Sequence, residues 1–285
     1  MPAQILDGKA LAKKMMSALK DECETLKGNG IAPKLVSIQV AGDDASSWYI
    51  RNQGKQAAKV GIEFEHVELP ADCDAATLEA TITRFNEDKG THGMILQVPL
   101  PKHLDGDRFQ QMIAPHKDVE GMTNASLGEL LRDGDDLVPC TARAAVELVV
   151  DAELPIQGKH CVVVGRSAIV GKPLALMMLA RHAHVTICHS RTPDLPAVCR
   201  QADILMTAVG RTPGMIDASY VKEGAVVVDI ATIATDEGSI TGDVDAASVA
   251  EVASWLAPVP GGVGPVTVCF LLRNALRAAA RSAMS

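Results

Sequence analysis

The chain has 285 residues, with 27 Lys and Arg against 35 Asp and Glu, and a formal net charge of −8. Hydrophobic residues make up 47% of the sequence, which excludes general disorder, and the length allows one large or two modest domains. The acidic balance and the 3% aromatic content argue against a nucleic-acid binder, because such proteins need basic patches and stacking rings. We therefore expect no nucleic-acid partner.

The seven cysteines include no Cys-x-x-Cys pair, and their odd number fits neither a disulfide framework nor a zinc ribbon. We predict free thiols, no metal site and a reducing, cytoplasmic location. The N-terminal segment lacks the basic and apolar regions of a signal peptide. No uncharged apolar run approaches the roughly 20 residues of a membrane span, so we expect no membrane partner.

Helical and strand patterns alternate along the chain, which is typical of a parallel sheet covered by helices. In the first half we predict helices over residues 10–26, 45–59 and 74–86, and strands over residues 34–40, 62–69 and 93–98. Residues 99–141 are irregular and contain several prolines. We interpret them as loops and short helices that border a binding cleft.

The second half repeats the alternation after a connecting helix over residues 143–151. We predict strands over residues 160–164, 185–189, 204–209, 225–230 and 255–257. A glycine-rich turn over residues 258–265 then leads into a final helix over residues 266–283. The predicted fold is α/β, with two α/β domains and a cleft between them, a common location for a ligand site.

A glycine turn joins the strand that ends at Val164 to the helix over residues 174–181. It contains Gly165 and Gly171, and such a turn places backbone N–H groups and a helix N-terminus against a phosphate. The spacing is not Gly-x-Gly-x-x-Gly, so a plain strand-to-helix turn stays an open alternative.

The following strand ends in His189-Ser190-Arg191-Thr192, without the acidic residue that binds the ribose 2′-hydroxyl in folds that prefer NAD. Arg166, Ser190 and Arg191 are available to bind a 2′-phosphate through charge-assisted hydrogen bonds. We therefore predict NADP as the cofactor of a Rossmann-type C-terminal domain. The alternative for Arg191 is a solvated surface charge.

In the first half, a phenol, two amides and a carboxylate are candidates for orienting a polar heterocycle. Tyr49 and Gln53 are four residues apart and share a helix face, and Gln97 lies at the end of a predicted strand. Glu120 belongs to the irregular segment that borders the predicted cleft. Purely structural interpretations also exist: Tyr49 as a core ring, Gln97 as a strand-end cap and Glu120 as a surface charge.

Motifs along nearly the whole chain carry a family resemblance. They occupy residues 5–8, 40–49, 96–101, 117–121, 139–141, 164–173, 188–192, 242–245 and 258–265. Together they resemble the bifunctional methylenetetrahydrofolate dehydrogenase/methenyltetrahydrofolate cyclohydrolase family. The resemblance implies oxidation of 5,10-methylenetetrahydrofolate by NADP, then hydrolysis of the 5,10-methenyl cation to 10-formyltetrahydrofolate.

The same resemblance implies a homodimer of two-domain subunits. The expected folate-binding catalytic domain covers residues 1–142 plus 267–285, and the expected NADP-binding Rossmann domain covers residues 143–266. The catalytic positions are Tyr49, which stacks along the aminobenzoyl ring, with Gln53, Gln97 and Glu120. The cofactor positions are Thr141, Gly165, Arg166, Ser167, Gly171, Ser190, Arg191, Ile230 and Thr267. The substrate positions are Tyr49, Gln97, Val98, Pro99, Leu100, Glu120, Pro260, Gly261 and Gly262.

The sequence departs from the family four residues after the tyrosine, where Gln53 replaces the catalytic lysine. A lysine moves protons during hydrolysis, whereas an amide has no proton that titrates near neutrality. Lys55 lies about 200° further around the helix axis, so it is poorly placed to substitute. We therefore predict weak or absent cyclohydrolase activity. Hydride transfer should persist, because it needs only the juxtaposition of the reacting carbons.

Three further departures are Glu120 in place of Asp, Ala142 in place of Pro, and Asp229-Ile-Ala-Thr-Ile233 in place of Asp-Val-Gly-Ile-Asn. They indicate a divergent paralogue or compensating drift. Three other hypotheses stay open. One is an enzyme of the same fold that acts on another one-carbon or pteridine substrate. Another is a non-catalytic folate- or nucleotide-binding subunit, and the last is an unimpaired bifunctional enzyme.

Overall fold

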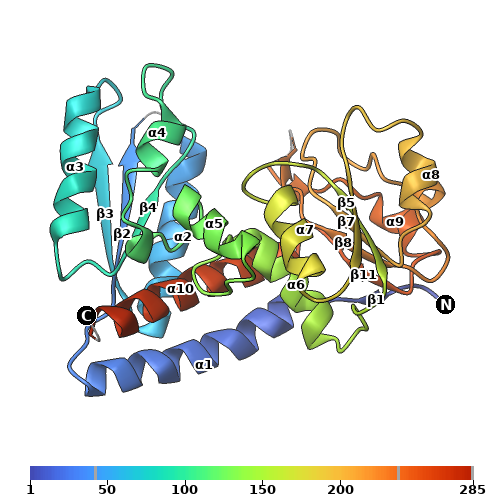
Figure 1. Cartoon of the computed structure of the whole chain (residues 1–285), viewed down its shortest axis with the longest axis horizontal. Helices are drawn as coiled ribbons and strands as arrows, with labels where there is room; N and C mark the ends of the chain where they lie inside the picture. The colour runs from blue at the N-terminus through green and yellow to red at the C-terminus, as the bar shows by residue number, and fades with distance from the viewer. Residues whose placement is uncertain (42–43, 236–237, 284–285) are drawn as a thin grey trace. The chain divides into compact units, whose positions relative to one another are not determined.

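The computed structural model describes residues 1–41, 44–235 and 238–283, and it divides the chain into two compact units (Figure 1). The N-terminal unit comprises Lys14–Val138 and Val268–Ser285, and the C-terminal unit comprises Met1–Lys13 and Pro139–Thr267. Among the described residues, none of the helices is both long and apolar enough to cross a membrane.

The N-terminal unit is built on a three-stranded parallel sheet in the order β3-β2-β4. Its strands are β2 (Lys34–Val40), β3 (Glu63–Leu69) and β4 (Gly93–Leu96). The central strand β2 is buried from Leu35 to Val40, the polar Ser37 and Gln39 included, as expected for a central parallel strand covered on both faces. Helices α2 (Asp44–Val60) and α3 (Ala75–Glu87) form the crossovers between the strands.

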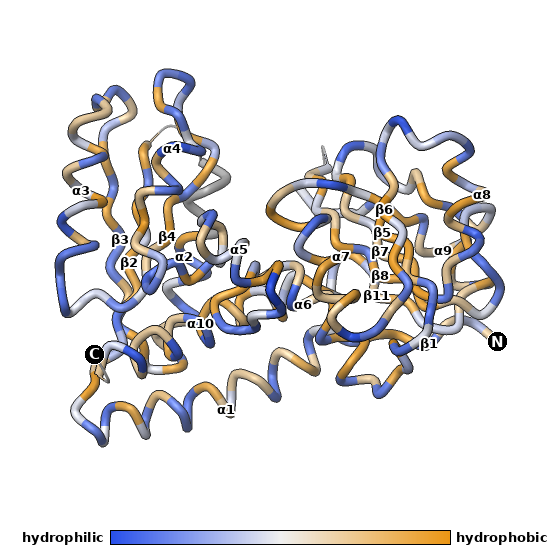
Figure 2. The backbone as a smooth tube through the Cα atoms, in the orientation of Figure 1, coloured by the Kyte–Doolittle hydropathy of each residue, from blue (hydrophilic) through white to orange (hydrophobic). Residues whose placement is uncertain are grey.

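One face of this sheet packs against α3 to form a core. Buried strand residues such as Ile38 and Met94 meet Leu78 and Phe85 of α3. The helix begins with a capped first turn, because the Asp74 side chain accepts a hydrogen bond from the Thr77 N–H. The position of α3 over the sheet is visible in Figure 1, and Figure 2 shows the apolar strands.

Short helices follow β4, as predicted for this irregular segment. They are α4 (Gly106–Gln110), the 3₁₀ turn η1 (Pro115–Lys117) and α5 (Asn124–Leu131). The C-terminal helix α10 (Val263–Ser282) holds this segment in place through Asn274, whose amide donates to the carbonyls of Val119 (2.8 Å) and Val138 (3.3 Å).

The C-terminal unit contains a six-stranded parallel sheet in the order β1-β11-β8-β7-β5-β6. Its strands are β1 (Gln4–Ile5), β5 (His160–Val164), β6 (His184–Cys188), β7 (Ile204–Thr207), β8 (Val226–Asp229) and β11 (Trp255–Ala257). Strand order reverses at β5, because β6 lies on one side of it and β7 on the other. The predicted Rossmann-type architecture is thus confirmed, and the reversal marks the usual ligand position at the carboxyl ends of the strands.

Helices connect the strands of this sheet. They are α6 (Cys140–Asp151), α7 (Gly171–Leu179), α8 (Leu195–Cys199), the 3₁₀ turn η2 (Ala218–Tyr220) and α9 (Ala246–Val249). A two-stranded hairpin of β9 (Ile233–Ala234) and β10 (Ile240–Thr241) follows β8. Neither this hairpin nor α9 was predictable from the sequence, because strands of two residues and a one-turn helix give no periodic signal.

Residues 1–13 belong to the C-terminal unit, whereas the expected domain boundaries placed them in the first domain. In the structure β1 pairs with β11, with Gln4 opposite Trp255 and Ile5 opposite Leu256. A strand of two exposed residues carries no alternating pattern, so this strand was not predictable from the sequence. The long helix α1 (Gly8–Gly28) starts in the C-terminal unit and continues into the other unit.

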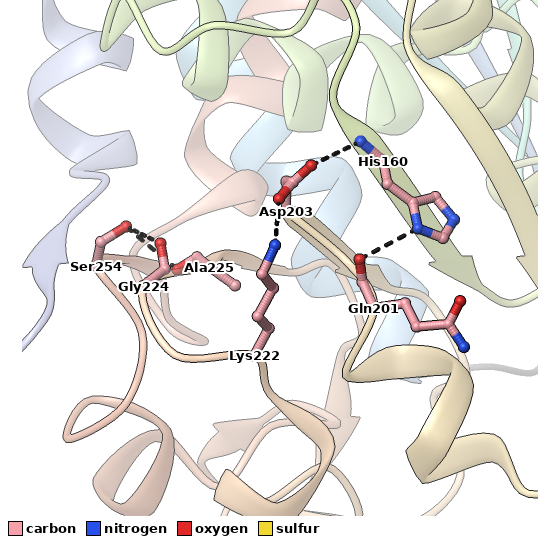
Figure 3. A network of polar contacts seen from close by, with 7 residues as sticks. All are labelled: His160, Gln201, Asp203, Lys222, Gly224, Ala225 and Ser254. Atoms are coloured by element: carbon pink, nitrogen blue, oxygen red, sulfur yellow. Dashed lines mark hydrogen bonds and ion pairs between the residues drawn. The ribbon is translucent and has the colours of Figure 1, made fainter.

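A polar network fastens the amino ends of the strands in the C-terminal sheet (Figure 3). One Asp203 oxygen lies 2.7 Å from Lys222 Nζ, and the other accepts a hydrogen bond from the His160 N–H at 3.0 Å. Ser254 Oγ donates to the Gly224 carbonyl at 2.7 Å. At the amino edge of the sheet, these polar groups are therefore hydrogen-bonded or ion-paired. A cavity of about 230 Å³ lies there, and none of the predicted site residues lines it.

Candidate functional site

The glycine turn after β5 is a place where only glycine fits. Gly165 has φ +136°, and a Cβ added there would lie 2.6 Å from the Ala208 carbonyl oxygen. A Cβ on Gly171 would lie 2.5 Å from the Gly165 carbonyl carbon. The backbone therefore turns tightly from β5 into α7, which is the geometry that lets a pyrophosphate approach a Rossmann sheet.

Ser167 fixes this turn from within. Its Oγ accepts hydrogen bonds from the N–H groups of Val170 (3.1 Å) and Gly171 (3.3 Å), which orders the start of α7. Arg166 is exposed beside it. The turn thus offers a guanidinium and a hydroxyl at the carboxyl edge of the sheet.

The loop after β6 adds two more exposed polar residues at the same edge. The Arg191 N–H donates to His189 Nδ1 (3.1 Å), and the His189 N–H donates to Thr192 Oγ1 (2.9 Å), so hydrogen bonds within the loop fix its conformation. Ser190 and Arg191 are exposed. Because β5 and β6 are adjacent parallel strands, Arg166 and Arg191 lie at neighbouring carboxyl ends, and this pair suits a 2′-phosphate.

Two buried acids shape the loops beyond β7 and β8. The Asp243 carboxylate accepts from the N–H groups of Val209 (2.7 Å) and Gly210 (2.8 Å). The Asp229 carboxylate accepts from the N–H groups of Val244 (2.9 Å) and Asp243 (3.2 Å). Burial raises the pKa of Asp229 to about 6, against the lowering effect of these backbone donors. Both acids lie in motifs of the sequence, but their roles were not predictable, because a carboxylate that binds backbone N–H groups of a distant loop has no sequence pattern.

The remaining predicted residues of the C-terminal unit lie in four places. Ile230 is buried directly after β8, and Thr141 is partly buried in the first turn of α6. Thr267 Oγ1 donates to the Val263 carbonyl inside α10 (3.2 Å). Residues 260–262 form the turn after β11, and this turn closes through the Gly262 N–H and the Pro258 carbonyl (2.9 Å).

In the N-terminal unit the predicted amides meet. Gln97 Nε2 donates to Ser37 Oγ at 3.0 Å and to Gln53 Oε1 at 3.1 Å, and we call these three residues the amide cluster. They come from β2, α2 and the end of β4, and the sequence analysis did not include Ser37. Lys55 is exposed whereas Gln53 is partly buried, in line with the predicted difference in helix face.

The other predicted residues of this unit surround the same strand end. Val98 and Pro99 are exposed and Leu100 is partly buried just beyond β4, which ends two residues earlier than predicted. Tyr49 belongs to α2, but its side chain lies outside the described part of the structure. Its predicted stacking role therefore stays a prediction.

Glu120 lies next to β4 in a turn closed by the Gly121 N–H and the Asp118 carbonyl (3.2 Å). Asp118 pairs with Met94 and is buried, and its Oδ2 accepts from the Thr123 N–H and Ser126 Oγ, both at 2.7 Å. Burial and the neighbouring Asp118 charge raise the pKa of Glu120 to about 8. Among the described residues, no hydrogen-bond donor reaches the partly buried Glu120 carboxyl.

The fold defines a two-unit α/β protein with a Rossmann-type dinucleotide-binding unit. Its candidate site residues lie at the carboxyl edge of the C-terminal sheet and around the end of β4 in the N-terminal unit. Residues 6–120 match the family model "Tetrahydrofolate dehydrogenase/cyclohydrolase, catalytic domain", and residues 139–283 match "Tetrahydrofolate dehydrogenase/cyclohydrolase, NAD(P)-binding domain". The chain belongs to the tetrahydrofolate dehydrogenase/cyclohydrolase family, which confirms the resemblance seen in the sequence.

Named relatives agree along their full length. The chain is 47% identical over 281 residues to the bifunctional protein FolD of Moorella thermoacetica, covering 99% of this chain and 100% of that one. A FolD structure from Campylobacter jejuni superposes with a TM-score of 0.95 at 36% identity, covering 98% and 99% of the two chains. The Trypanosoma brucei enzyme, solved with NADP cofactor and an inhibitor, superposes with a TM-score of 0.94 at 35% identity, covering 100% of both chains.

Proposed function

We propose that the chain is an NADP-dependent methylenetetrahydrofolate dehydrogenase of one-carbon metabolism whose cyclohydrolase activity is weak or lost. Its membership of the family and its similarity to named bifunctional relatives support the dehydrogenase. The amide cluster carries the second part of the proposal. An amide of Gln53, in hydrogen-bond contact with Gln97, occupies the position of the family's lysine.

NADP fits the residues at the carboxyl edge of the C-terminal sheet. A Cβ at Gly165 or Gly171 would collide with neighbouring backbone, so glycine is needed at both positions of this turn. The exposed Arg166, Ser190 and Arg191 would hold the 2′-phosphate. When bound, NADP supplies a nicotinamide ring that accepts hydride. The chain's own task is to hold the folate methylene carbon against that ring with the correct orientation.

Hydrolysis makes a different demand on the protein. Addition of water to the methenyl carbon requires a group that removes a proton from that water. The amide cluster contains two amides and a hydroxyl, none of which titrates near neutrality. The same cluster can orient the substrate by hydrogen bonding, so binding and hydride transfer persist while hydrolysis slows.

The test supplies the two reactions separately. Methylenetetrahydrofolate with NADP should form NADPH, whereas methenyltetrahydrofolate alone should disappear at nearly its uncatalysed rate. Gln53→Lys should raise hydrolysis by at least tenfold, because one positioned proton-transfer group is worth about 10²–10⁴-fold. Lys55→Gln is the matched control two residues along the same helix. Fast hydrolysis by the wild-type protein that Lys55→Gln abolishes would contradict the proposal.

We further propose that the enzyme works as a cytoplasmic homodimer, as its family resemblance implies. The absence of a Cys-x-x-Cys pair and the seven buried free thiols favour a reducing compartment. Light scattering during size-exclusion chromatography measures the mass directly. A particle with the mass of a single chain would refute the dimer.

A further inference from the structure

The cavity at the amino edge of the C-terminal sheet lies apart from the dinucleotide edge of the same sheet. It is lined by the first residues of β7, β8 and β11 and by the segments that lead into them. Along β5, Lys159 at this edge and Gly165 at the other are about 20 Å apart, at about 3.3 Å per strand residue. A ligand in the cavity would therefore not meet a dinucleotide bound at the carboxyl edge.

The acids of this cavity offer little to a cationic ligand. Both oxygens of Asp203 are engaged, one by Lys222 Nζ (2.7 Å) and the other by the His160 N–H (3.0 Å), as Figure 3 shows. The hydrogen bonds from Lys222 and the His160 N–H, together with the charge of Lys159, hold the pKa of Asp203 below its usual value. Glu223 is exposed, so water solvates its charge.

Two donors that line the cavity have no partner in the described part of the chain. Lys159 is partly buried, and no described acceptor lies within hydrogen-bond or ion-pair distance of its ammonium. The indole N–H of Trp255, which is also partly buried, likewise has no acceptor among the described residues. Half-buried donors of this kind bind an acceptor supplied by water or by a ligand. The cavity thus favours a ligand that carries acceptor oxygens.

The size and surface of the cavity restrict the ligand further. Its volume of about 230 Å³ is below the roughly 300–1,000 Å³ of drug-sized sites, so it has room for one small molecule. The Trp255 ring, Leu154 and Pro155 give it apolar walls, which suit a planar ring. Strands β5 and β11 are three strands apart, roughly 14 Å at about 4.8 Å per strand. The side chains of Lys159 and Trp255 reduce this gap to the length of a ring with one substituent.

The charge of the lining indicates a single negative charge on the ligand. Two lysines and two acids line the cavity, and Lys222 is paired with Asp203. Lys159 is left to bind one anionic group. A doubly charged anion would be repelled by the carboxylates of Asp203 and Glu223.

We propose that this cavity binds a small aromatic monocarboxylate, whose ring lies against Trp255 and whose carboxylate accepts a hydrogen bond from Lys159 Nζ. The inference goes beyond the proposed dehydrogenase function and does not depend on it. Lys159 supplies the charge-assisted hydrogen bond, and the apolar walls supply the area that the ring buries. Neither part requires a folate or a dinucleotide to be present.

The experiment is calorimetric titration of the intact protein at about pH 8 with benzoate, benzamide and inorganic phosphate. Benzoate should bind with a Kd on the order of 1 mM or below. Benzamide lacks the charge and phosphate lacks the ring, so each should bind at least tenfold more weakly. Saturating NADP and 5-formyltetrahydrofolate should leave the benzoate affinity unchanged. No benzoate binding, equal affinity for benzamide or phosphate, or displacement of benzoate by either large ligand would overturn the proposal.

A lysine variant tests the anchor of the carboxylate. Lys159→Met keeps the apolar stem, removes the ammonium and should weaken benzoate binding about tenfold or more. Lys89→Met removes an exposed lysine of the N-terminal unit and is the matched control, which should bind benzoate as the wild-type protein does. Wild-type affinity in Lys159→Met would contradict the assignment.

Trp255 reports the position of the ring directly. The chain has two tryptophans, so Trp48→Phe leaves Trp255 as the only one. In this variant benzoate should change the tryptophan emission with the Kd found by calorimetry, and constant emission at saturation would place the ligand elsewhere. If the variants do not fold, the wild-type titrations decide the matter. Failure of turnover with any folate would refute the proposed function without affecting these titrations.

Discussion

Gly8 offers a sharp test of how the turn after β11 is held. It is the first residue of α1, and its backbone packs against the Gly261–Gly262 segment of the same unit. A Cβ added at Gly8 would overlap the Gly262 carbonyl oxygen, lie 2.6 Å from its carbon and lie 2.8 Å from the Gly261 oxygen. Since ordinary contact begins at 3.4 Å, Gly8→Ala requires the turn to retreat by more than about 1 Å.

The cost follows from what must move. The obstructing atoms are backbone atoms, so no side-chain rotation relieves the overlap, and overpacking of this kind destabilises by about 1–3 kcal/mol. For a chain of this size, the melting temperature should fall by roughly 2–4 °C for each kcal/mol. Residues 260–262 are also predicted to bind substrate. A displacement near 1 Å can lower kcat/KM by about 10²-fold.

Gly28→Ala is the matched control, because Gly28 is the last residue of the same helix and an added Cβ would meet nothing within 4 Å. It should leave activity unchanged and stabilise the protein by up to about 1 kcal/mol. Thermal unfolding and initial rates of NADPH formation measure both variants. If Gly8→Ala keeps the wild-type melting temperature and kcat/KM, the turn moves without cost and the reasoning is wrong.

Asn274→Leu should destabilise the protein by about 2–4 kcal/mol in urea unfolding, because two backbone carbonyls lose a buried donor. By comparison, Arg281→Gln removes a surface ion pair and should destabilise the protein by at most about 1 kcal/mol. Arg191→Ala should raise the KM for NADP about tenfold and leave that for NAD unchanged; an equal rise for both would contradict a 2′-phosphate role. Burial raises the pKa of Asp229 from 3.8 to about 6, so its stabilising contribution is complete below about pH 4 and is lost as the pH rises through about 6. The urea midpoint of Asp229→Asn should therefore depend less on pH over that range than the wild-type midpoint, and an identical slope would argue against the shift.

Long periodic elements were predictable from the sequence, whereas short ones were not. The strands at residues 34–40 and 160–164 have the predicted bounds, because each is a short β-rich run that forms an inner strand of a parallel sheet. Strand β4 ends at Leu96 because the prolines that follow interrupt the ladder. The edge strand β1 depends on a partner near the other end of the chain, which no local pattern encodes.

The candidate site also has one part that local sequence predicted and another that it did not. Glycine spacing and the absence of an acid after β6 indicated the dinucleotide edge, since those features follow from local backbone geometry. Helix spacing indicated Gln53 and a strand end indicated Gln97 as candidates, and the structure brings the two amides into contact. Ser37, Asp118 and Asp243 act through tertiary contacts that join distant segments. Such roles become visible only when the strands are placed side by side.

The pairing of β1 with β11 also has a consequence for synthesis of the protein. During synthesis, β1 finds its partner only after Trp255–Ala257 has followed, and the N-terminal unit likewise waits for the residues of α10 beyond Thr267. Neither unit can close before nearly the whole chain has been translated. Incomplete chains thus carry open sheet edges and uncovered apolar faces, which are the features that favour aggregation.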